Sequence, residues 1–486
     1  MANPNYRSEK DFIGIVDIPK DALYGIHSKR AQQNFPDTTP FHIEWYRAIG
    51  LVKKACYLTA KEFYAKVIER NELGKLKSTI IDNKVLSSMI KSADEVSNGL
   101  HYGNFITPAI SGGAGTSINL NVNEIISNRS LQIEGKMPGE YYLIDPIEHA
   151  NIFQSTNDVI PTSLKLAVIQ LLTELEEAIN KVRQQLERLE KSYQYTLRSG
   201  FTQMQEAVPS SYGKLFSTYS EALSRDWWRI SKCFERIKVV NLGGSAIGSG
   251  ITVPRFYVME VVRNLQELSE LPITRGENLY DATSNLDTFV EVHGILKSFA
   301  VNSEKMMSDL RLLSSDLFAK KEMSLPNKQV GSSIMPGKVN PVIPEFVISC
   351  AHKVYANDML VSGLCAQGCL ELNAYIPTIG HALIDSLKLL KASADTMLDN
   401  VLNEIQIDTS QAETNLLRSP SITTALVPYV GYNKAAELAR MMKSEDLSIY
   451  GANSVLELIV PDKLKEILKP ENLLKEGFSI KDLTEE

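Results

Sequence analysis

The chain of 486 residues has few cysteines, no long apolar run and no dense stretch of lysine and arginine. Its five cysteines are an odd number and are scattered along the chain (Cys56, Cys233, Cys350, Cys365 and Cys369). The first residues, MANPNYRSEKDF, contain no apolar signal region. This pattern argues against a disulfide scaffold and predicts reduced thiols in the cytoplasm.

The missing apolar and basic runs exclude two classes of partner. The uncharged, largely apolar run at residues 359–370 is too short to span a bilayer. The net charge of −7 and the lack of basic stretches with interleaved aromatics argue against nucleic acid. Cys365 and Cys369 are four residues apart, but no histidine or carboxylate cluster accompanies them, so we expect buried helical thiols and no metal site.

Long helical periodicity is what the chain has in abundance. Between Leu164 and Leu189 the apolar residues recur at every third or fourth position, which predicts an amphipathic helix of roughly 40 Å. Similar patterns cover residues 214–240, 286–315, 344–372 and 378–402. The pattern over 344–372 is apolar nearly all round, which predicts a helix buried on every side. Such helices need partners along their whole lengths, so we expect a mainly α fold and a helical oligomer with a shared core.

The periodicity changes twice along the chain, which predicts three regions. Residues 1–152 are more broken and form a mixed, mostly helical N-terminal domain. Residues 153–405 carry the long helices, and residues 406–486 form a small C-terminal helical domain with shorter elements. A chain of this length exceeds what one hydrophobic core usually serves, which agrees with several sub-domains.

Several polar or glycine-rich stretches are candidates for chemistry. The stretch GSSIMPGKVNP at 331–341 is poor helix material; its residues alone favour a plain turn over an anion clamp. The stretch QSTND at 154–158 precedes the longest helix, where helix capping is favoured over binding of a carboxylate. The stretch GGSAIGSG at 243–250 lacks the spacing of a nucleotide loop, and SGGAGTS at 111–117 fits no nucleotide fingerprint.

The stretch GSSIMPGKVNP closely resembles the signature of the aspartase/fumarase superfamily, lyases that eliminate a group beta to a carboxylate and release fumarate or a similar product. The resemblance extends over nearly the whole chain, at residues 21–35, 113–126, 154–162, 202–209, 243–250, 293–297 and 425–439. It implies a three-domain subunit with a central bundle of long helices. It also implies a homotetramer in which three subunits build each site.

Four features resemble the aspartase branch more than the class II fumarase branch: Thr156, the run Gly113–Ser117, His27 and Gln203. The implied reaction is loss of ammonia from L-aspartate to give fumarate, through removal of a Cβ proton and an aci-carboxylate intermediate. Two alternatives stay open. One is a class II fumarase, which adds water to fumarate, and the other is a non-catalytic paralogue.

The resemblance also assigns roles to residues, and it implies no metal and no organic cofactor. Ser332 is the base, and His149 is a possible supporting residue. The β-carboxylate is surrounded by Thr116, Ser155, Thr156 and Ser333. The remaining substrate contacts are Lys338 and Asn340 at the α-carboxylate, Thr202, and, at the amino group, Asn157 and Gln203.

Three positions depart from the superfamily pattern. Phe201 stands where the superfamily usually has arginine, and Ile376 stands where aspartases usually have glutamate. Ser245 replaces a common threonine, which is a mild change. Phe201 and Ile376 are not among the residues assigned to the substrate, so these two departures indicate divergence within the function.

Overall fold

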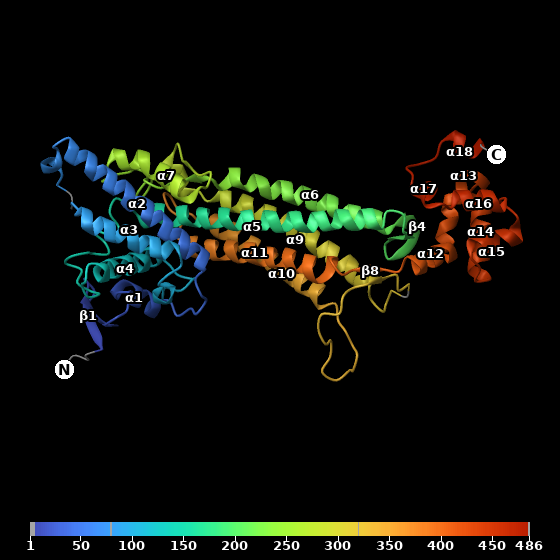
Figure 1. The fold of residues 1–486 in the computed structure, drawn as a ribbon, viewed down its shortest axis with the longest axis horizontal. Coiled ribbons are helices and arrows are strands. Elements are labelled where there is room, and N and C mark those ends of the chain that lie inside the picture. Colours follow the sequence, from blue (N-terminus) through green and yellow to red (C-terminus); the bar gives the residue numbers. More distant parts are fainter. Residues whose placement is uncertain (1–4, 78–79, 319, 485–486) are drawn as a thin grey trace. The chain divides into compact units, whose positions relative to one another are not determined.

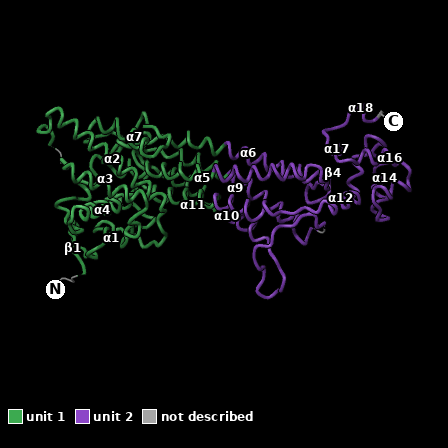
Figure 2. The backbone as a smooth tube through the Cα atoms, in the orientation of Figure 1, with its two compact units in different colours: residues 1–175, 229–297, 353–390 green, residues 176–228, 298–352, 391–486 purple. Residues whose placement is uncertain are grey.

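The computed structural model describes residues 5–77, 80–318 and 320–484. The chain divides into two compact units, shown in Figure 2. Unit 1 comprises residues 1–175, 229–297 and 353–390, and unit 2 comprises residues 176–228, 298–352 and 391–486. The described elements are mostly helices, so the mainly α fold class predicted from the sequence is confirmed. The division into three domains stays a prediction.

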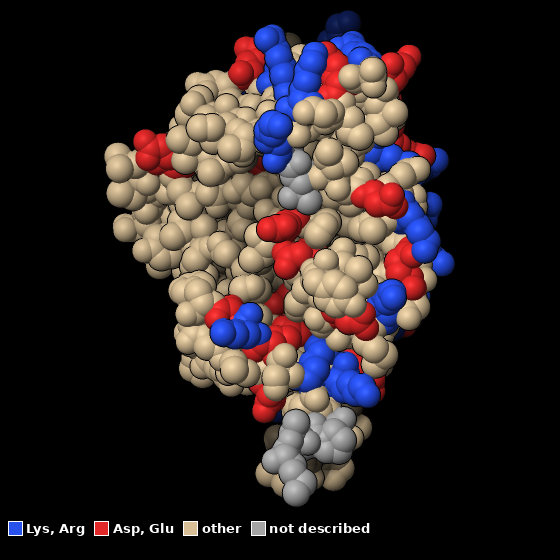
Figure 3. Space-filling view, turned by 90° about the vertical axis from the view of Figure 1, so that its left-hand side faces the viewer, with Lys and Arg blue, Asp and Glu red and all other residues tan. Residues whose placement is uncertain are grey.

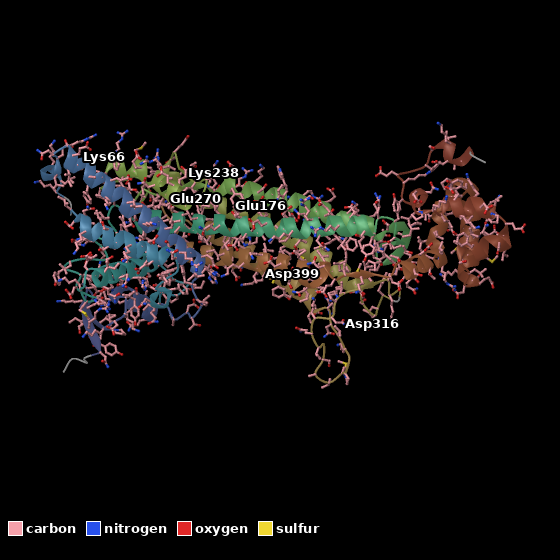
Figure 4. All side chains as sticks on the ribbon, viewed as in Figure 1. Lys66, Glu176, Lys238, Glu270, Asp316 and Asp399 are labelled. Atoms are coloured by element: carbon pink, nitrogen blue, oxygen red, sulfur yellow. The ribbon has the colours of Figure 1, made fainter. Side chains whose placement is uncertain are left out.

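Unit 1 begins with a hairpin of β1 (Tyr6–Lys10) and β2 (Ile15–Pro19), followed by α1 (Ile26–Asn34). Its longer helices are α2 (Ile43–Glu69), α3 (Asn83–Ser97), α4 (Thr116–Ile133) and α7 (Arg255–Ser269). Helix α2 packs against α3 and α7, and α3 packs against α4 (Figure 1). Lys66, in the last turn of α2 (Figure 4), lies over the ring of Phe256 at 4.2 Å, which ties α2 to α7.

The predicted long helices are present, with bounds close to those expected. They are α5 (Thr156–Ser192), α6 (Tyr212–Ile237), α9 (Asp287–Leu313), α10 (Val342–Cys365) and α11 (Ile376–Met397), which a π-helical turn (Leu398–Leu402) continues. Every apolar position that predicted α5 is buried: Leu164, Val168, Leu171, Leu175, Ile179, Val182, Leu186 and Leu189. The 3.6-residue period thus identified the face that packs into the core.

Two expectations about the helix over 344–372 are wrong. Helix α10 ends at Cys365, because the Asn373 amide donates to the carbonyls of Leu364 and Cys365 and caps the helix C-terminus. Cys369 therefore lies outside the helix and is exposed, whereas a buried helical thiol was expected. The helix is also not buried on every side within this chain, since Met359 is 75% exposed.

Unit 2 contains the hairpin of β3 (Leu197–Thr202) and β4 (Gln205–Ser211) and the short pair β7 (Met323–Ser324) and β8 (Gln406–Ile407). Its C-terminal helices are α12 (Thr409–Arg418), α13 (Val427–Val430), α14 (Tyr432–Ser444), α15 (Ile449–Leu456), α16 (Pro461–Ile467), α17 (Pro470–Leu473) and α18 (Ile480–Thr484). Buried apolar side chains from these helices, among them Leu416, Leu438, Ile449 and Leu464, form their own core cluster. The short elements expected after residue 405 are therefore held by local packing.

The remaining short elements belong to loops. In unit 1 they are β5 (Val239–Val240), paired in parallel with β6 (Thr274–Arg275), helix α8 (Leu279–Ser284) and two 3₁₀ turns (Leu73–Lys75 and Tyr102–Asn104). In unit 2 a 3₁₀ helix (Pro420–Leu426) precedes α13. On the face drawn in Figure 3, lysine and arginine side chains lie among aspartate and glutamate side chains. That face carries charges of both signs.

Candidate active site

The first turn of α5 is closed by a reciprocal pair of side-chain caps. The Ser155 Oγ accepts a hydrogen bond from the Asn157 N–H at 3.2 Å, and the Asp158 Oδ1 accepts one from the Ser155 N–H at 2.9 Å. This is a capping box, which satisfies N–H groups that a helix start leaves without partners. The capping role favoured for QSTND is therefore present, and it fixes the backbone of Ser155, Thr156 and Asn157.

The glycine-rich stretch 243–250 braces the same turn from another part of unit 1. The N–H groups of Gly243 and Ser245 donate to the Asp158 Oδ2 at 3.2 and 3.0 Å. Asp158 is fully buried, and this burial raises the pKa of its carboxyl group to about 6. The stretch GGSAIGSG thus holds a buried carboxylate that itself holds Ser155.

Pro161 lies inside α5 and removes the N–H that would bond the carbonyl of Asn157. That carbonyl instead accepts a hydrogen bond from the Asn241 amide at 2.9 Å. The Asn157 side-chain amide donates to the carbonyl of Ala246 at 2.8 Å. The Asn157 Oδ1 makes no hydrogen bond with the residues that the structure describes, so this acceptor remains available.

The N-terminus of α4 meets the start of α5. Gly115 caps α4 with a φ of 90°, and a Cβ at this position would lie 2.9 Å from the Ile160 Cγ2. Only glycine fits both the dihedral angle and this close approach. Thr116, the first residue of α4, is exposed. Two helix starts, each with the positive end of a helix dipole, thus lie near one another, which suits a carboxylate.

His149 is held in a local turn just before α5. Its Nδ1 accepts a hydrogen bond from the Asp145 N–H at 2.9 Å, while the Asp145 Oδ1 accepts from the N–H groups of Ile147 and Glu148. The ring therefore stabilises the turn that leads into Gln154. Its supporting role at the site stays a prediction.

Lys53 is a residue near the site that sequence reasoning missed. It is fully buried in α2 and donates to the Gln154 Oε1 at 2.7 Å, directly before Ser155. Burial lowers the pKa of its ammonium group to about 7. The sequence could have indicated this residue, because Lys53 falls on the same helix face as the apolar residues Ile49, Val52 and Cys56. A lysine buried on such a face needs dedicated hydrogen-bond partners.

Thr202 and Gln203 lie at the tip of the β3–β4 hairpin in unit 2. Thr202 pairs with Gln205, so Gln203 and Met204 form a two-residue turn with φ of 52° and 60°. Positive φ at both positions matches the primed turns of tight hairpins, where asparagine and glycine are preferred. The turn presents both Thr202 and Gln203 to solvent.

The stretch 331–341 forms a loop that is closed by its own hydrogen bonds. The Gly331 N–H donates to the Lys338 carbonyl at 2.8 Å, and the Asn340 amide donates to the Gly331 carbonyl at 2.7 Å. Within the loop the Ser332 Oγ accepts from the N–H groups of Ile334 and Met335 at 3.2 and 3.0 Å. The residues therefore make a shaped turn that places two donors on the Ser332 oxygen.

Lys338 and Ser333 are exposed on this loop. The Lys338 ammonium forms no ion pair with any described residue, so its charge is available to an anion. Asn340 is half-buried and uses its amide to close the loop, while its Oδ1 forms no hydrogen bond with the described residues.

The candidate residues fall into two groups. Thr116, His149, Ser155, Thr156 and Asn157 belong to unit 1, where the starts of α4 and α5 bring Thr116 and the capping box together. The second group belongs to unit 2: Thr202, Gln203, Ser332, Ser333, Lys338 and Asn340. Each unit thus carries one part of the site predicted from the sequence.

The described residues lack two features, a cluster of metal-ligating side chains and a helix that could span a membrane. No group of three histidine, cysteine, aspartate or glutamate side chains there is placed to hold a metal ion. Likewise, none of the helices that the structure describes has the length and apolarity needed to cross a membrane.

Comparisons with known proteins agree over the whole length of the chain. A family model described as "Lyase" matches residues 14–356, and one described as "Fumarase C C-terminus" matches residues 422–475. An aspartate ammonia-lyase from Bacillus sp is 36% identical over 98% of this chain and 99% of its own length. The aspartate ammonia-lyase of Escherichia coli (strain K12) is 35% identical over 100% of this chain and 99% of its own length.

Solved structures share the fold. The crystal structure described as fumarate lyase:delta crystallin from Brucella melitensis bound to cobalt has a TM-score of 0.87 at 32% identity, over 96% of this chain and 99% of that one. A recombinant class II fumarase from Schistosoma mansoni has a TM-score of 0.83 at 25% identity, over 96% of this chain and 98% of that one. The curated relatives and the solved structures therefore both match this chain over nearly its whole length.

Proposed function

The chain belongs to the lyase family that includes the aspartate ammonia-lyases, and from this premise we propose that it converts L-aspartate to fumarate and ammonia. The resemblance to the aspartase/fumarase superfamily stated from the sequence is confirmed. The observation that carries the proposal is the full-length similarity to aspartate ammonia-lyases at 35–36% identity. The class II fumarase alternative has less support, because that structure is 25% identical.

We propose that the substrate β-carboxylate binds where α4 and α5 begin. Thr116 opens α4, and Ser155 and Thr156 open α5, so their hydroxyl groups stand at the positive ends of two helix dipoles that lie near one another. During the reaction negative charge moves onto this carboxylate as the aci-carboxylate forms. Fixed donors that already point there stabilise that charge more than they stabilise the substrate, which lowers the barrier.

Ser332 is the proposed base that takes the Cβ proton. A serine hydroxyl is a weak base in water, and hydrogen bonds to its oxygen favour the deprotonated form. The N–H groups of Ile334 and Met335 provide two such bonds within the loop. The unpaired charge of Lys338 on the same loop favours an anion as well, and we propose that Lys338 and Asn340 hold the α-carboxylate while Ser333 reaches the β-carboxylate.

The amino group leaves in the second step. After the Cβ proton has moved to Ser332, the electron pair forms the double bond, the C–N bond breaks and ammonia departs. An ammonium group needs acceptors, and the Asn157 Oδ1 is available while its amide is held by Ala246. We propose that Gln203 contacts the same group and that Thr202 contacts the substrate beside it.

We propose a homotetramer in which each site draws on three subunits, as the superfamily resemblance implies. Apolar side chains of α10, such as Met359 (75% exposed), Leu360 and Phe346, support it because they lack cover within one chain. The three-domain division, a supporting role of His149 and a cytoplasmic location are part of the same proposal. The chemistry needs no metal or organic cofactor.

A substrate panel tests the function. The protein is incubated separately with L-aspartate and with L-malate while the absorbance of fumarate is followed. We expect turnover of L-aspartate. Turnover of L-malate alone would assign the hydratase reaction, and no turnover of either compound would support a non-catalytic paralogue.

The base is tested by replacing Ser332 with alanine. Loss of a general base lowers kcat by about 10²–10⁴-fold, and we expect the assembly to be preserved. Ser349→Ala is the matched control, because Ser349 is exposed on α10 and its hydroxyl donates only to the Glu345 carbonyl. A Ser332→Ala variant with turnover equal to that of Ser349→Ala would show that another group is the base.

A further inference from the structure

A cavity of about 390 Å³ lies in unit 2 between the β3–β4 hairpin and α9. The hairpin contributes Arg198, Phe201 and Met204 to its walls. Most other wall residues are leucines of α6, of α9 and of the segment that follows α9, which Asp316 marks in Figure 4. The volume is in the range of sites that bind small organic molecules.

The cavity is open at one end and buried at the other. Leu317 and Met204 are 92% and 80% exposed, whereas Arg198 and Leu313 are 6% and 7% exposed. The rings of Phe201 and Phe318 meet edge to face with centroids 5.1 Å apart and form an aromatic wall. A ligand that enters past Leu317 would therefore meet apolar surface first and Arg198 at the closed end of the cavity.

Arg198 is a buried cation without a polar partner. Its Nε makes no hydrogen bond, and its guanidinium group forms no ion pair or hydrogen bond with any described residue. Its neighbours are the rings of Tyr212 at 5.1 Å and Phe201 at 5.7 Å. Buried guanidinium groups usually satisfy several of their five donors, so this one lacks an acceptor.

The nearby carboxylates are already engaged elsewhere. The Tyr212 hydroxyl donates to the Glu322 Oε2 at 2.8 Å, and the Tyr219 hydroxyl donates to the Asp309 Oδ2 at 2.8 Å. Lys305 also pairs with Asp309. Neither carboxylate forms an ion pair or a hydrogen bond with Arg198, so the donors of its guanidinium group find no acceptor among the described residues.

We propose that this cavity binds a small monocarboxylic acid with an apolar body. Its carboxylate accepts hydrogen bonds from Arg198, and its body packs between Phe201, Phe318 and Leu313. A single carboxylate fits because Arg198 is the one cation of the described wall that lacks an acid partner. Phe201 occupies the position where the superfamily usually has arginine, so the aromatic wall is a feature of this chain.

The cavity is coupled to the proposed active site through the hairpin. Arg198 and Phe201 lie on β3, which continues directly into Thr202 and Gln203 at the tip. Occupancy would hold the hairpin and change the apparent affinity for substrate. This consequence rests on the proposed function, whereas binding of the acid does not.

Calorimetric titration of the full chain with sodium 3-phenylpropionate tests the proposal. We expect saturable binding, and binding of the neutral analogue 3-phenylpropan-1-ol that is at least tenfold weaker. Arg198→Gln should weaken binding of the acid at least tenfold. Arg311→Gln, a charge change on exposed α9 surface outside the cavity, should leave binding unchanged.

Three results would overturn the proposal: no saturable binding of the acid, equal binding of acid and alcohol, or binding that Arg198→Gln leaves intact. If Arg198→Gln does not fold, the comparison of acid and alcohol on the unaltered protein decides the matter. Lys338→Ala should bind the acid normally. Loss of binding in that variant would place the acid on the loop of residues 331–341 and refute the cavity as its site.

Discussion

Replacing Gly248 with alanine tests how the loop of residues 243–250 supports the site. Gly248 has a φ of +87°, and a Cβ there would lie 2.4 Å from backbone atoms of Leu279 and Tyr280. Because these are backbone atoms at the start of α8, no rotamer change relieves the overlap. The same loop donates two N–H groups to Asp158 and accepts the Asn157 amide, so its displacement reaches the first turn of α5.

The expected cost has two parts. A left-handed backbone costs an alanine about 1–2 kcal/mol. Overpacking against a fixed neighbour costs about 1–3 kcal/mol more. Gly250→Ala is the matched control, since Gly250 also has a positive φ, of +62°, but its nearest contacts are at 3.6 Å. We therefore expect Gly248→Ala to lose roughly 2–5 kcal/mol of unfolding free energy and Gly250→Ala only the backbone part.

Urea unfolding followed by circular dichroism measures the two free energies, and the absorbance of fumarate measures turnover of L-aspartate. Gly248→Ala should lower kcat/KM more than Gly250→Ala does, because it moves Ser155 and Asn157. Equal stabilities of the two variants, within about 0.5 kcal/mol, would refute the overlap argument. Unequal stabilities with equal turnover would instead refute the link between this loop and the site.

Three further predictions concern charge and assembly. Lys338→Ala should raise KM and lower kcat, for a loss of roughly 10–100-fold in kcat/KM. The control Lys328→Ala removes a lysine that is paired with Glu404, and it should leave the kinetics unchanged. Unchanged kinetics in both variants would exclude the contact between Lys338 and the carboxylate. Burial raises the pKa of Glu124 to about 7, above its ordinary 4.5, so its contribution to stability is full below about pH 4.5 and is lost as the pH rises through 7. Urea unfolding at several pH values measures the difference in unfolding free energy between the unaltered protein and Glu124→Gln. As the pH falls from 8 to 5, this difference should shift in favour of the unaltered protein by on the order of 3 kcal/mol. A difference that does not change with pH would contradict the raised pKa of Glu124. Met359→Glu should dissociate the proposed tetramer, which light scattering would detect as a lower mass. Val455 is also apolar and exposed, and Val455→Glu should leave the mass unchanged. An intact tetramer in the Met359→Glu variant would show that the subunit contact does not involve this part of α10.

The helices and their buried faces could be predicted from the sequence, because helix formation depends on residues three and four positions apart. Every apolar position expected in α5 is buried. The cap at Ser155 was predictable for the same reason, since both partners of the capping box lie within four residues. The helix over 344–372 was misjudged twice: Asn373, a residue beyond the helix, ends it at Cys365, and part of its surface is exposed within this chain.

The contacts that give the site its shape were not predictable from local pattern. Asp158 meets Gly243 and Ser245 across more than eighty residues, and Lys53 meets Gln154 across about a hundred. Nothing in the spacing of these residues signals that they meet, because the fold of the whole unit brings them together. The same holds for Arg198, whose lack of a partner becomes visible only once α9 and the hairpin pack around it.

The sequence by itself determined the helical class, the family and the identity of the loop that carries Ser332, since these are properties of short-range pattern and of residue order. The tertiary structure decided which polar groups are held and which are left available. It closed the loop around the Ser332 oxygen, brought the start of α4 close to α5 at Gly115 and Ile160, and placed Arg198 in the wall of a cavity. The physical reason is that burial and hydrogen-bond satisfaction depend on all neighbours in space, and most of those neighbours are distant in the chain.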